Sequence, residues 1–405
     1  MDAPRRPRLT APIALVLCWL VYVAAYLARA GISAGYEQLA AHFGTDGAYL
    51  GIVGSAFFAA YAVGQLINGF WGDRLRPESF IAASMLGSAC VYGLALLLDS
   101  ATALPVLWAG NGIFLSMLWG PMLRLLCIRF GQARKAKLAM VMGAAPVGGY
   151  CLAWLVLAPR MPALGWRAVF AVPLALTLAL LACWLLLMRA GADPSALGAD
   201  WSRKRHTLRD TYRYVSAHKL WPLALTSLCL GLVKENLALL LPALFLGFLG
   251  TSVGSGSWLL LLSPLANLTG LLAGWSLARP LTARPASSLA YTFLAMALMC
   301  GLLAFTLGNR TAAFAALFLL AALAYLGSCI QISYLPLSHA DENMISTLVG
   351  LFDFANYVGA AAASIVLGAL MAAEQWRAVS LIWLGVCAFA SLCAFGKARR
   401  KAAGK

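Results

Sequence analysis

Charged side chains are scarce in this chain of 405 residues, and acidic ones are scarcer still. Asp, Glu, Lys and Arg make up only 11% of the residues, against about 25% in an ordinary soluble protein. So few charges cannot cover the surface of one or two globular domains, which excludes a soluble enzyme. The 30 basic residues outnumber the 14 acidic ones, but they lie between apolar runs. A nucleic-acid-binding domain would gather them on one face, so we expect no nucleic-acid partner.

Metal-binding and redox motifs are missing as well. The four histidines all fall in polar breaks of the sequence, and none of the ten cysteines pairs with another at CxxC spacing. These spacings offer neither a zinc site nor a disulfide framework. No glycine-rich loop ends in Lys-Ser or Lys-Thr, so the chain encodes no ATP-binding motif. We therefore expect no catalytic residue, no metal and no cofactor.

Apolar residues are abundant, at 62% of the chain, and they occur in runs of about 20. A helix of about 20 apolar residues spans the hydrocarbon layer of a bilayer, and the ten-residue alternation of a membrane β-barrel is absent. The pattern predicts an all-α membrane protein with twelve transmembrane helices in two six-helix halves. The predicted spans are 11–37, 48–71, 79–98, 105–130, 138–160, 166–188, 221–249, 254–277, 288–307, 311–336, 345–372 and 376–395.

The distribution of Lys and Arg predicts the orientation. With the N-terminus in the cytoplasm, the outer segments hold only Arg160, Arg167, Arg310 and Arg377, while nearly all other bases lie inside. This asymmetry favours cytoplasmic positions for both termini. The predicted organisation is an N-terminal bundle over 1–188, a cytoplasmic loop over 189–220, a C-terminal bundle over 221–395 and a basic cytoplasmic tail over 396–405. The second part of the loop is either a short helix on the membrane face or an irregular linker.

Three bases remain inside predicted spans, and two of them belong to an internal repeat. Arg29 and Lys234 are 205 residues apart, and so are the tracts that end at Arg74 and Arg279. Self-similarity at a fixed offset indicates a duplication. Since six spans separate the copies, both halves enter the membrane in the same direction, with a binding site expected at their interface near the midplane.

The loop between the second and third spans carries the motif Gly69-xxx-Asp73-Arg74. It is similar to the Gly-x-x-x-Asp-Arg-x-Gly-Arg cytoplasmic motif of the major facilitator superfamily. This resemblance implies the fold of that superfamily, and it implies that Asp73 and Arg74 form a cytoplasmic gate.

Further motifs point to one family within that superfamily. The first span reads Tyr22-xxx-Tyr26-xx-Arg29, and a Trp-Ala-Gly-Asn-Gly tract precedes Trp119-Gly-Pro121 in the fourth. With these motifs the chain resembles the organophosphate:phosphate antiporters, which include glycerol-phosphate and hexose-phosphate transporters and a related sensor. Where that family has a second phosphate-binding arginine, this chain has Lys234. A family lysine is replaced by Gln65, and a family histidine is absent.

The predicted substrate site combines the repeat with these motifs. A cation within a span must face water or a counter-charge, and Arg29 and Lys234 facing each other suit a phosphate or carboxylate. The acidic residues Asp353 and Glu235 are candidates for proton coupling or counter-charge. Because neighbours on a helix point about 100° apart, Lys234 and Glu235 need not pair. The predicted substrate-binding residues are Arg29, Lys234, Tyr22, Tyr26, Tyr61, Trp119 and Tyr357.

These features predict a secondary active transporter of the plasma (inner) membrane. It is expected to move a small organic anion, with organophosphates and sugar phosphates among the candidates, by alternating access. The expected energy source is anion exchange or proton coupling, with a proton or phosphate as the coupling ion. We expect a monomer in the lipid bilayer. Two alternatives stay open: a membrane sensor of an external sugar phosphate, and a proton-driven exporter of apolar or cationic compounds.

Overall fold

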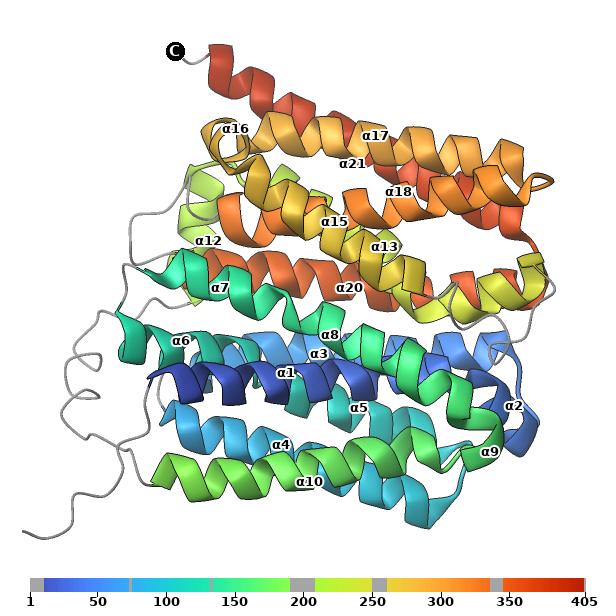
Figure 1. Ribbon diagram of the computed structural model, residues 1–405. Helices are drawn as coiled ribbons and strands as arrows, with labels where there is room; N and C mark the ends of the chain where they lie inside the picture. Colours follow the sequence, from blue (N-terminus) through green and yellow to red (C-terminus); the bar gives the residue numbers. More distant parts are fainter. Residues whose placement is uncertain are drawn as a thin grey trace, which may run out of the picture.

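The computed structural model of the chain describes residues 11–72, 75–131, 134–189, 208–249, 261–335 and 345–403. These residues are almost entirely helical, and none of them lies in a strand. Figure 1 shows the helices of the N-terminal half, α1 to α10, running side by side in one group. The helices of the C-terminal half, α13 to α21, form a second group against it.

The N-terminal half follows the predicted spans closely. The third span begins at Pro77, which fits the first turn of a helix because proline lacks the N–H that would be unpaired there. The first, fourth and fifth spans are broken into shorter pieces. The helices are α1 (Ala11–Ala34), α2 (Tyr36–Phe43), α3 (Gly47–Gly72), α4 (Pro77–Leu98), α5 (Ala103–Leu115), α6 (Trp119–Phe130), α7 (Lys135–Gly143), α8 (Ala145–Leu152), the π-helical turn η2 (Ala153–Leu157), the 3-10 turn η3 (Ala158–Arg160), α9 (Met161–Leu164) and α10 (Ala168–Arg189).

The break in the fourth span has a local cause. Pro121 lies in the first turn of α6 and has no N–H to donate to the carbonyl four residues earlier. At the break, the hydroxyl of Ser116 donates to the carbonyl of Ile113 at 2.6 Å. The amide of Asn68 in α3 donates to the same hydroxyl, also at 2.6 Å. The break therefore replaces helical hydrogen bonds with side-chain ones.

The C-terminal half begins after a short helix, α12 (Leu208–Ala217), in the predicted central loop, so the second part of that loop is helical. The last helix continues beyond residue 395 into the basic tail, where Lys, Arg and Ala are good helix formers. The remaining elements are α13 (Trp221–Leu249), α15 (Leu262–Ser276), α16 (Ala278–Ala283), α17 (Pro285–Thr306), α18 (Arg310–Cys329), the π-helical turn η5 (Ile330–Tyr334), α20 (Ile345–Ala372) and α21 (Trp376–Ala403).

Eleven helical segments in the described residues are long and apolar enough to cross a bilayer. The eighth predicted span, 254–277, is described only from residue 261 onward, where α15 supplies 15 residues. The count of twelve and the orientation of the termini stay predictions.

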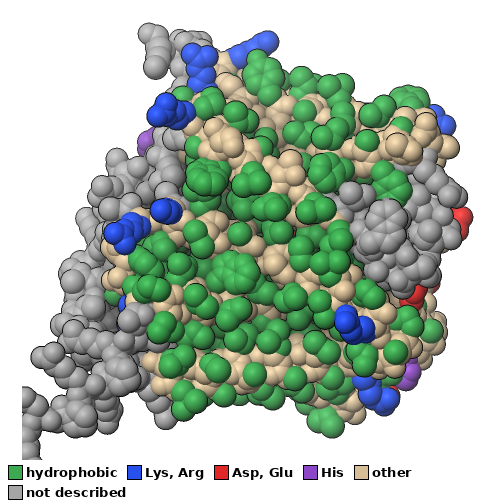
Figure 2. All heavy atoms as spheres, in the orientation of Figure 1, with side chains coloured by type: hydrophobic (Ala, Val, Ile, Leu, Met, Phe, Trp, Pro, Cys, Tyr) green, Lys and Arg blue, Asp and Glu red, His purple; other side chains and the backbone are tan. Residues whose placement is uncertain are grey.

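Large apolar side chains lie on the outside of the helices. Leu97, Leu186 and Phe305 are 80%, 75% and 78% exposed. Figure 2 shows hydrophobic side chains across the middle of the face in view, with Lys and Arg toward its two ends. Exposing such a surface to water costs free energy, whereas exposing it to lipid does not. The molecule therefore has the surface of a membrane protein.

Candidate functional site

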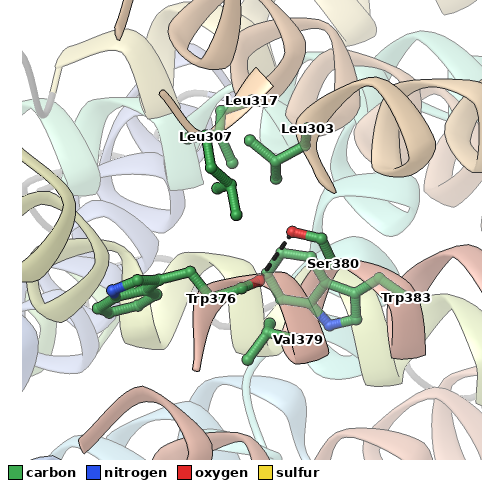
Figure 3. Close-up of a pocket in the computed structure, with 7 residues that line it drawn as sticks. All are labelled: Leu303, Leu307, Leu317, Trp376, Val379, Ser380 and Trp383. Carbon is green, nitrogen blue, oxygen red and sulfur yellow. Dashed lines mark hydrogen bonds between the residues drawn. The ribbon is translucent and has the colours of Figure 1, made fainter. Parts of the chain in front are cut away.

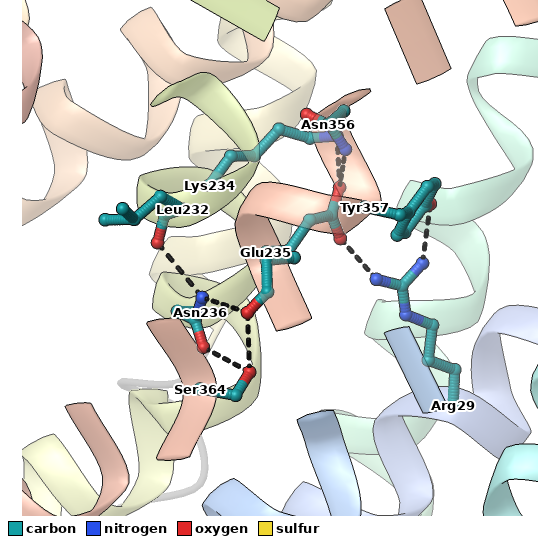
Figure 4. Close-up of polar contacts among 9 residues, drawn as sticks. Arg29, Leu232, Lys234, Glu235, Asn236, Asn356, Tyr357 and Ser364 are labelled. Atoms are coloured by element: carbon teal, nitrogen blue, oxygen red, sulfur yellow. Dashed lines mark hydrogen bonds and ion pairs between the residues drawn. The ribbon is translucent and has the colours of Figure 1, made fainter. Parts of the chain in front are cut away.

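Arg29 lies on α1 where the two halves of the molecule meet (Figure 4). Its Nη2 forms an ion pair with the carboxylate of Glu235 on α13. Its Nη1 donates a hydrogen bond to the hydroxyl of Tyr357 on α20 at 3.1 Å. The Arg29 side chain is only 10% exposed, so an unpaired charge here would be costly. Both arms of the guanidinium are therefore bound to groups of the other half.

Lys234 also pairs with Glu235. Its Nζ lies 2.7 Å from Oε1 of Glu235, although neighbouring residues on a helix point in different directions. The long lysine stem allows the ammonium to bend back toward the carboxylate, so the two do pair. The amide of Asn356 lies 3.5 Å from the same oxygen. Glu235, itself 3% exposed, thus joins both predicted cations at one carboxylate.

A close helix crossing places Glu235 beside α20. A Cβ on Gly231 would lie 1.7 Å from the carbonyl oxygen of Asn356, which no side chain tolerates. Gly231 precedes Glu235 by four residues and so lies on the same face of α13. Further along that crossing, the hydroxyl of Ser364 donates to the side-chain amide oxygen Oδ1 of Asn236 at 2.6 Å (Figure 4). Backbone contact and polar side chains therefore hold α13 and α20 in one register.

Aromatic rings enclose the Arg29 guanidinium. Its Cζ atom lies 5.2 Å from the ring centroid of Phe58, 5.3 Å from that of Phe57, 5.4 Å from that of Tyr357 and 5.6 Å from that of Tyr26. Each face-on ring attracts a cation by about 0.5–2 kcal/mol, and more when water is excluded. The rings come from α1, α3 and α20. Arg29 therefore sits in an aromatic cage as well as in an ion pair.

The other predicted aromatic residues extend this cage. The ring centroids of Tyr61 and Tyr357 are 4.2 Å apart. Tyr22 lies 5.1 Å from Tyr26 and 5.5 Å from Trp119. The structure thus brings all seven predicted substrate-binding residues into one connected cluster, since Lys234 joins it through Glu235.

Asp353 lies on α20, four residues before Tyr357, and is partly buried. Among the described residues, no cation comes within 4.0 Å of its carboxylate. The charges of Lys234, Glu235 and Arg29 nevertheless act on it. The counter-charge of Lys234 is therefore Glu235 and not Asp353. The predicted gate residues Asp73 and Arg74 lie outside the described residues, so their role stays a prediction.

Sequence reasoning missed several residues of the cluster. Phe57 and Phe58 lie in an unbroken apolar run of α3, which gives no signal that they face a cation. Asn356 adjoins Tyr357 and could have been found with it. Tyr150 follows directly on the Val-Gly-Gly tract of the fifth span, and its ring lies 5.8 Å from that of Tyr26.

Small residues line the seam between the halves at the predicted outer end. A Cβ on Gly51 of α3 would lie 2.4 Å from the carbonyl oxygen of Ser364 on α20. The hydroxyl of Ser55 donates to the carbonyl of Ala361 at 2.9 Å, and that of Ser33 to the carbonyl of Leu239 at 2.8 Å. Close backbone approach of this kind joins helices in a membrane. The halves are therefore packed tightly together at this end.

A separate small cavity lies between α17, α18 and α21 (Figure 3). The hydroxyl of Ser380 donates to the carbonyl of Trp376 at 3.0 Å, which leaves the lining apolar. No predicted site residue lines it. In the part of the chain that the structure describes, no three His, Cys, Asp or Glu side chains gather into a metal-binding cluster. The polar cluster at the interface of the halves is thus the candidate site.

A model of the Major Facilitator Superfamily matches residues 18–364, so the chain belongs to that superfamily. The family and the eleven apolar helices among the described residues therefore make it a multi-pass protein of the plasma membrane that belongs with transporters and not with enzymes. The resemblance to organophosphate transporters is supported by curated relatives. Probable hexose phosphate transport proteins of Chlamydia trachomatis serovar D and Chlamydia muridarum are 26% identical over 181 residues. That match covers 44% of this chain but only 39% and 38% of those proteins.

Solved structures share the fold over nearly the whole chain. A bacterial homologue of the human lysosomal transporter Spinster, inward-facing and unoccupied, has a TM-score of 0.75 at 15% identity, with 98% of each chain covered. The nucleoside transporter NupG has a TM-score of 0.72 at 14% identity, covering 95% of this chain and 98% of that one. At these identities the similarity establishes the fold alone.

Proposed function

We propose that this protein transports a small organic anion, bound at the site where Arg29 and Lys234 meet, by alternating access. The observation that carries the proposal is that these two cations, one from each half, meet at a single carboxylate in the interior. A group that binds both cations can control the interface, because it bridges bodies that must rock against each other. The relatives named as probable hexose phosphate transport proteins support an anionic substrate.

The surroundings of Arg29 fit the recognition of a carboxylate or phosphate. A guanidinium presents several N–H donors in a planar fork, and such oxyanions accept them in pairs. Tyr22, Tyr26, Tyr61, Trp119 and Tyr357 supply rings and hydroxyl groups around that fork, which suits a small polar metabolite with a carbon skeleton. The tight seam at the predicted outer end leaves the opposite, cytoplasmic end as the expected route of access in this conformation.

Uptake into proteoliposomes tests the proposal. Purified protein is reconstituted and supplied with radiolabelled inorganic phosphate, glycerol 3-phosphate, glucose 6-phosphate and gluconate. We expect saturable uptake or exchange of at least one of them. Arg29→Gln should reduce it by about a hundredfold or more, because a buried charge-assisted bidentate contact is lost.

Arg160→Gln is the matched control, since Arg160 is an exposed base outside the cluster whose guanidinium donates to the carbonyl of Val156. Its uptake should equal that of the unaltered protein. Undiminished uptake by Arg29→Gln, or transport of none of the four anions, would contradict the proposal. Binding without uptake or exchange would identify a sensor instead.

A further inference from the structure

The positive charges of Arg29 and Lys234 already have a counter-charge within the protein. Glu235 accepts an ion pair from Arg29 through Oε2 and one from Lys234 through Oε1. The second arm of Arg29 is bound to the hydroxyl of Tyr357. A substrate anion therefore becomes the counter-ion of Arg29 by taking the place of Glu235. Glu235 is the acceptor of the same chemical kind as the substrate group.

The two ion pairs of Glu235 are not equivalent. Lys234 and Glu235 are neighbours on α13 and travel together when the C-terminal half moves. Arg29 belongs to the N-terminal half, so its pair with Glu235 crosses the interface. An incoming anion can take over Arg29 while Glu235 keeps Lys234. Only one cation is then released to the substrate, and the site offers one positive charge and not two.

Asp353 completes the charge balance. Two cations and two carboxylates give a neutral empty site, and a neutral site is closed off from water in the low-dielectric interior at the least cost. One additional negative charge disturbs this balance unless a proton enters with it. Glu235 is held ionised by two cations, whereas Asp353 has no cation within 4.0 Å among the described residues. The charged and titratable groups acting on or facing Asp353 are Tyr22 and Arg29 on α1, Tyr61 on α3, and Lys234 and Glu235 on α13.

We propose that the substrate is an organic anion with a single negative charge, and that it is carried together with one proton. The anion replaces Glu235 at Arg29, Glu235 stays with Lys234, and the proton converts the Asp353 carboxylate to the acid. No bond within the substrate forms or breaks. Empty and loaded sites then have the same net charge. This inference rests on the proposed function and specifies its substrate class and coupling ion.

The first test compares two anions with similar carbon skeletons and different charges. Gluconate carries one negative charge, and glucose 6-phosphate carries nearly two at pH 7.5. Their Kd values are measured on purified full-length protein by thermal shift and calorimetry. The unaltered protein should bind gluconate more tightly. Glu235→Gln adds one net positive charge and should shift the ratio of the two Kd values toward glucose 6-phosphate by about tenfold or more.

Glu235→Asp is the control, because it keeps the charge and should keep the preference for gluconate. Tighter binding of glucose 6-phosphate by the unaltered protein, or an unchanged ratio in a folded Glu235→Gln, would overturn the single-charge assignment. Should Glu235→Gln fail to fold, the preference of the unaltered protein and of Glu235→Asp decides the question.

The second test measures the proton. Proteoliposomes containing a pH-sensitive dye receive gluconate outside, with the outside more acidic than the lumen. We expect accumulation of gluconate against its gradient, one proton entering per anion, and no net current. Asp353→Asn should lose this pH-driven accumulation by about tenfold or more while exchange of gluconate falls much less. Asp353→Glu should retain pH-driven accumulation.

The outcomes separate this inference from the proposed function. Accumulation that ignores the pH gradient, or a net current, would overturn proton coupling, and pH-driven accumulation by Asp353→Asn would overturn the assignment of the proton to Asp353. If Arg29→Gln still abolishes uptake in those cases, the anion site stands and only the charge or the coupling is wrong. If neither gluconate nor glucose 6-phosphate binds or enters, the single-charge assignment fails, and if none of the four anions does, both proposals fail.

Discussion

Arg29 and Lys234 occupy matching places in the two halves, 205 residues apart, yet their surroundings differ. Arg29 is caged by four aromatic rings, and its counter-charge comes from the other half. Among the described residues, Lys234 has the ring of Tyr325 at 5.9 Å, and its counter-charge is its own neighbour in the chain. The predicted duplication accounts for the matching positions of the cations, but in the described part of the chain only Arg29 has a counter-charge across the interface. The two cations therefore have different expected roles.

The largest expected effect concerns the carboxylate shared by both. Glu235→Gln leaves two buried cations without a counter-charge and should destabilise the empty protein by about 3 kcal/mol. The melting temperature of the purified protein, measured without added anions, checks this. Glu374→Gln is the control, since Glu374 is exposed at the end of α20. Equal melting temperatures for the two variants would mean that the shared ion pair contributes nothing to stability.

Arg29→Lys should have the next largest effect, on anion binding. A lysine keeps the charge but has no planar fork, so it cannot hold Glu235 and Tyr357 in the same geometry. We expect at least about tenfold weaker binding of the transported anion. Lys234→Arg keeps the charge and adds donors, so its affinity should stay within about threefold. Equal losses in the two variants would contradict the division of roles.

Exchange of the two residues sharpens the comparison further. If the repeat alone set the function, the double variant Arg29→Lys with Lys234→Arg would bind as the unaltered protein does. We expect it to bind no better than Arg29→Lys alone, because the aromatic cage surrounds position 29 only. A double-mutant cycle on the Kd of the transported anion measures the coupling. Full recovery in the double variant would show that the two positions are interchangeable.

The smallest expected effect belongs to the hydroxyl of Tyr357. Tyr357→Phe removes the acceptor of the Arg29 Nη1 hydrogen bond and leaves a ring at that position. One hydrogen bond to a neutral acceptor contributes about 0.5–1 kcal/mol, so affinity should change by about twofold to fivefold. Tyr325→Phe is a useful comparison, because its hydroxyl donates to the carbonyl of Gly143 and not to a cation. It should leave the Kd almost unaltered.

Much of the candidate site was predictable because bases inside apolar spans are rare. Arg29 and Lys234 stand out against runs of Ala, Leu and Val, and the fixed offset connects them. The tyrosines at steps of four and three before Arg29 mark the same helix face. By contrast, Phe57 and Phe58 look like ordinary lipid-facing or packing residues. Which face of α3 turns inward depends on its contacts with α5 and α20, and a nearly uniform apolar run does not encode that choice.

The pairing of Lys234 with Glu235 could not be predicted from the sequence either. Their positions along the helix predict divergent directions, and the sequence offered Asp353 as an equally reasonable counter-charge. The choice depends on Gly231, which lets α13 approach α20 closely enough for Asn356 to reach the Glu235 carboxylate. Such a preference arises from backbone distances between helices that are more than 100 residues apart in the chain.

The amino-acid sequence alone determined that this chain is a helical membrane transporter with a doubled architecture, because bilayer thickness and the cost of charge in lipid act on local runs of residues. It also identified the few polar residues to which we assign the proposed function. Only the tertiary structure decided which carboxylate neutralises which cation and which rings surround Arg29. Those contacts join α1, α3, α13 and α20, and their geometry follows from how the helices pack against one another.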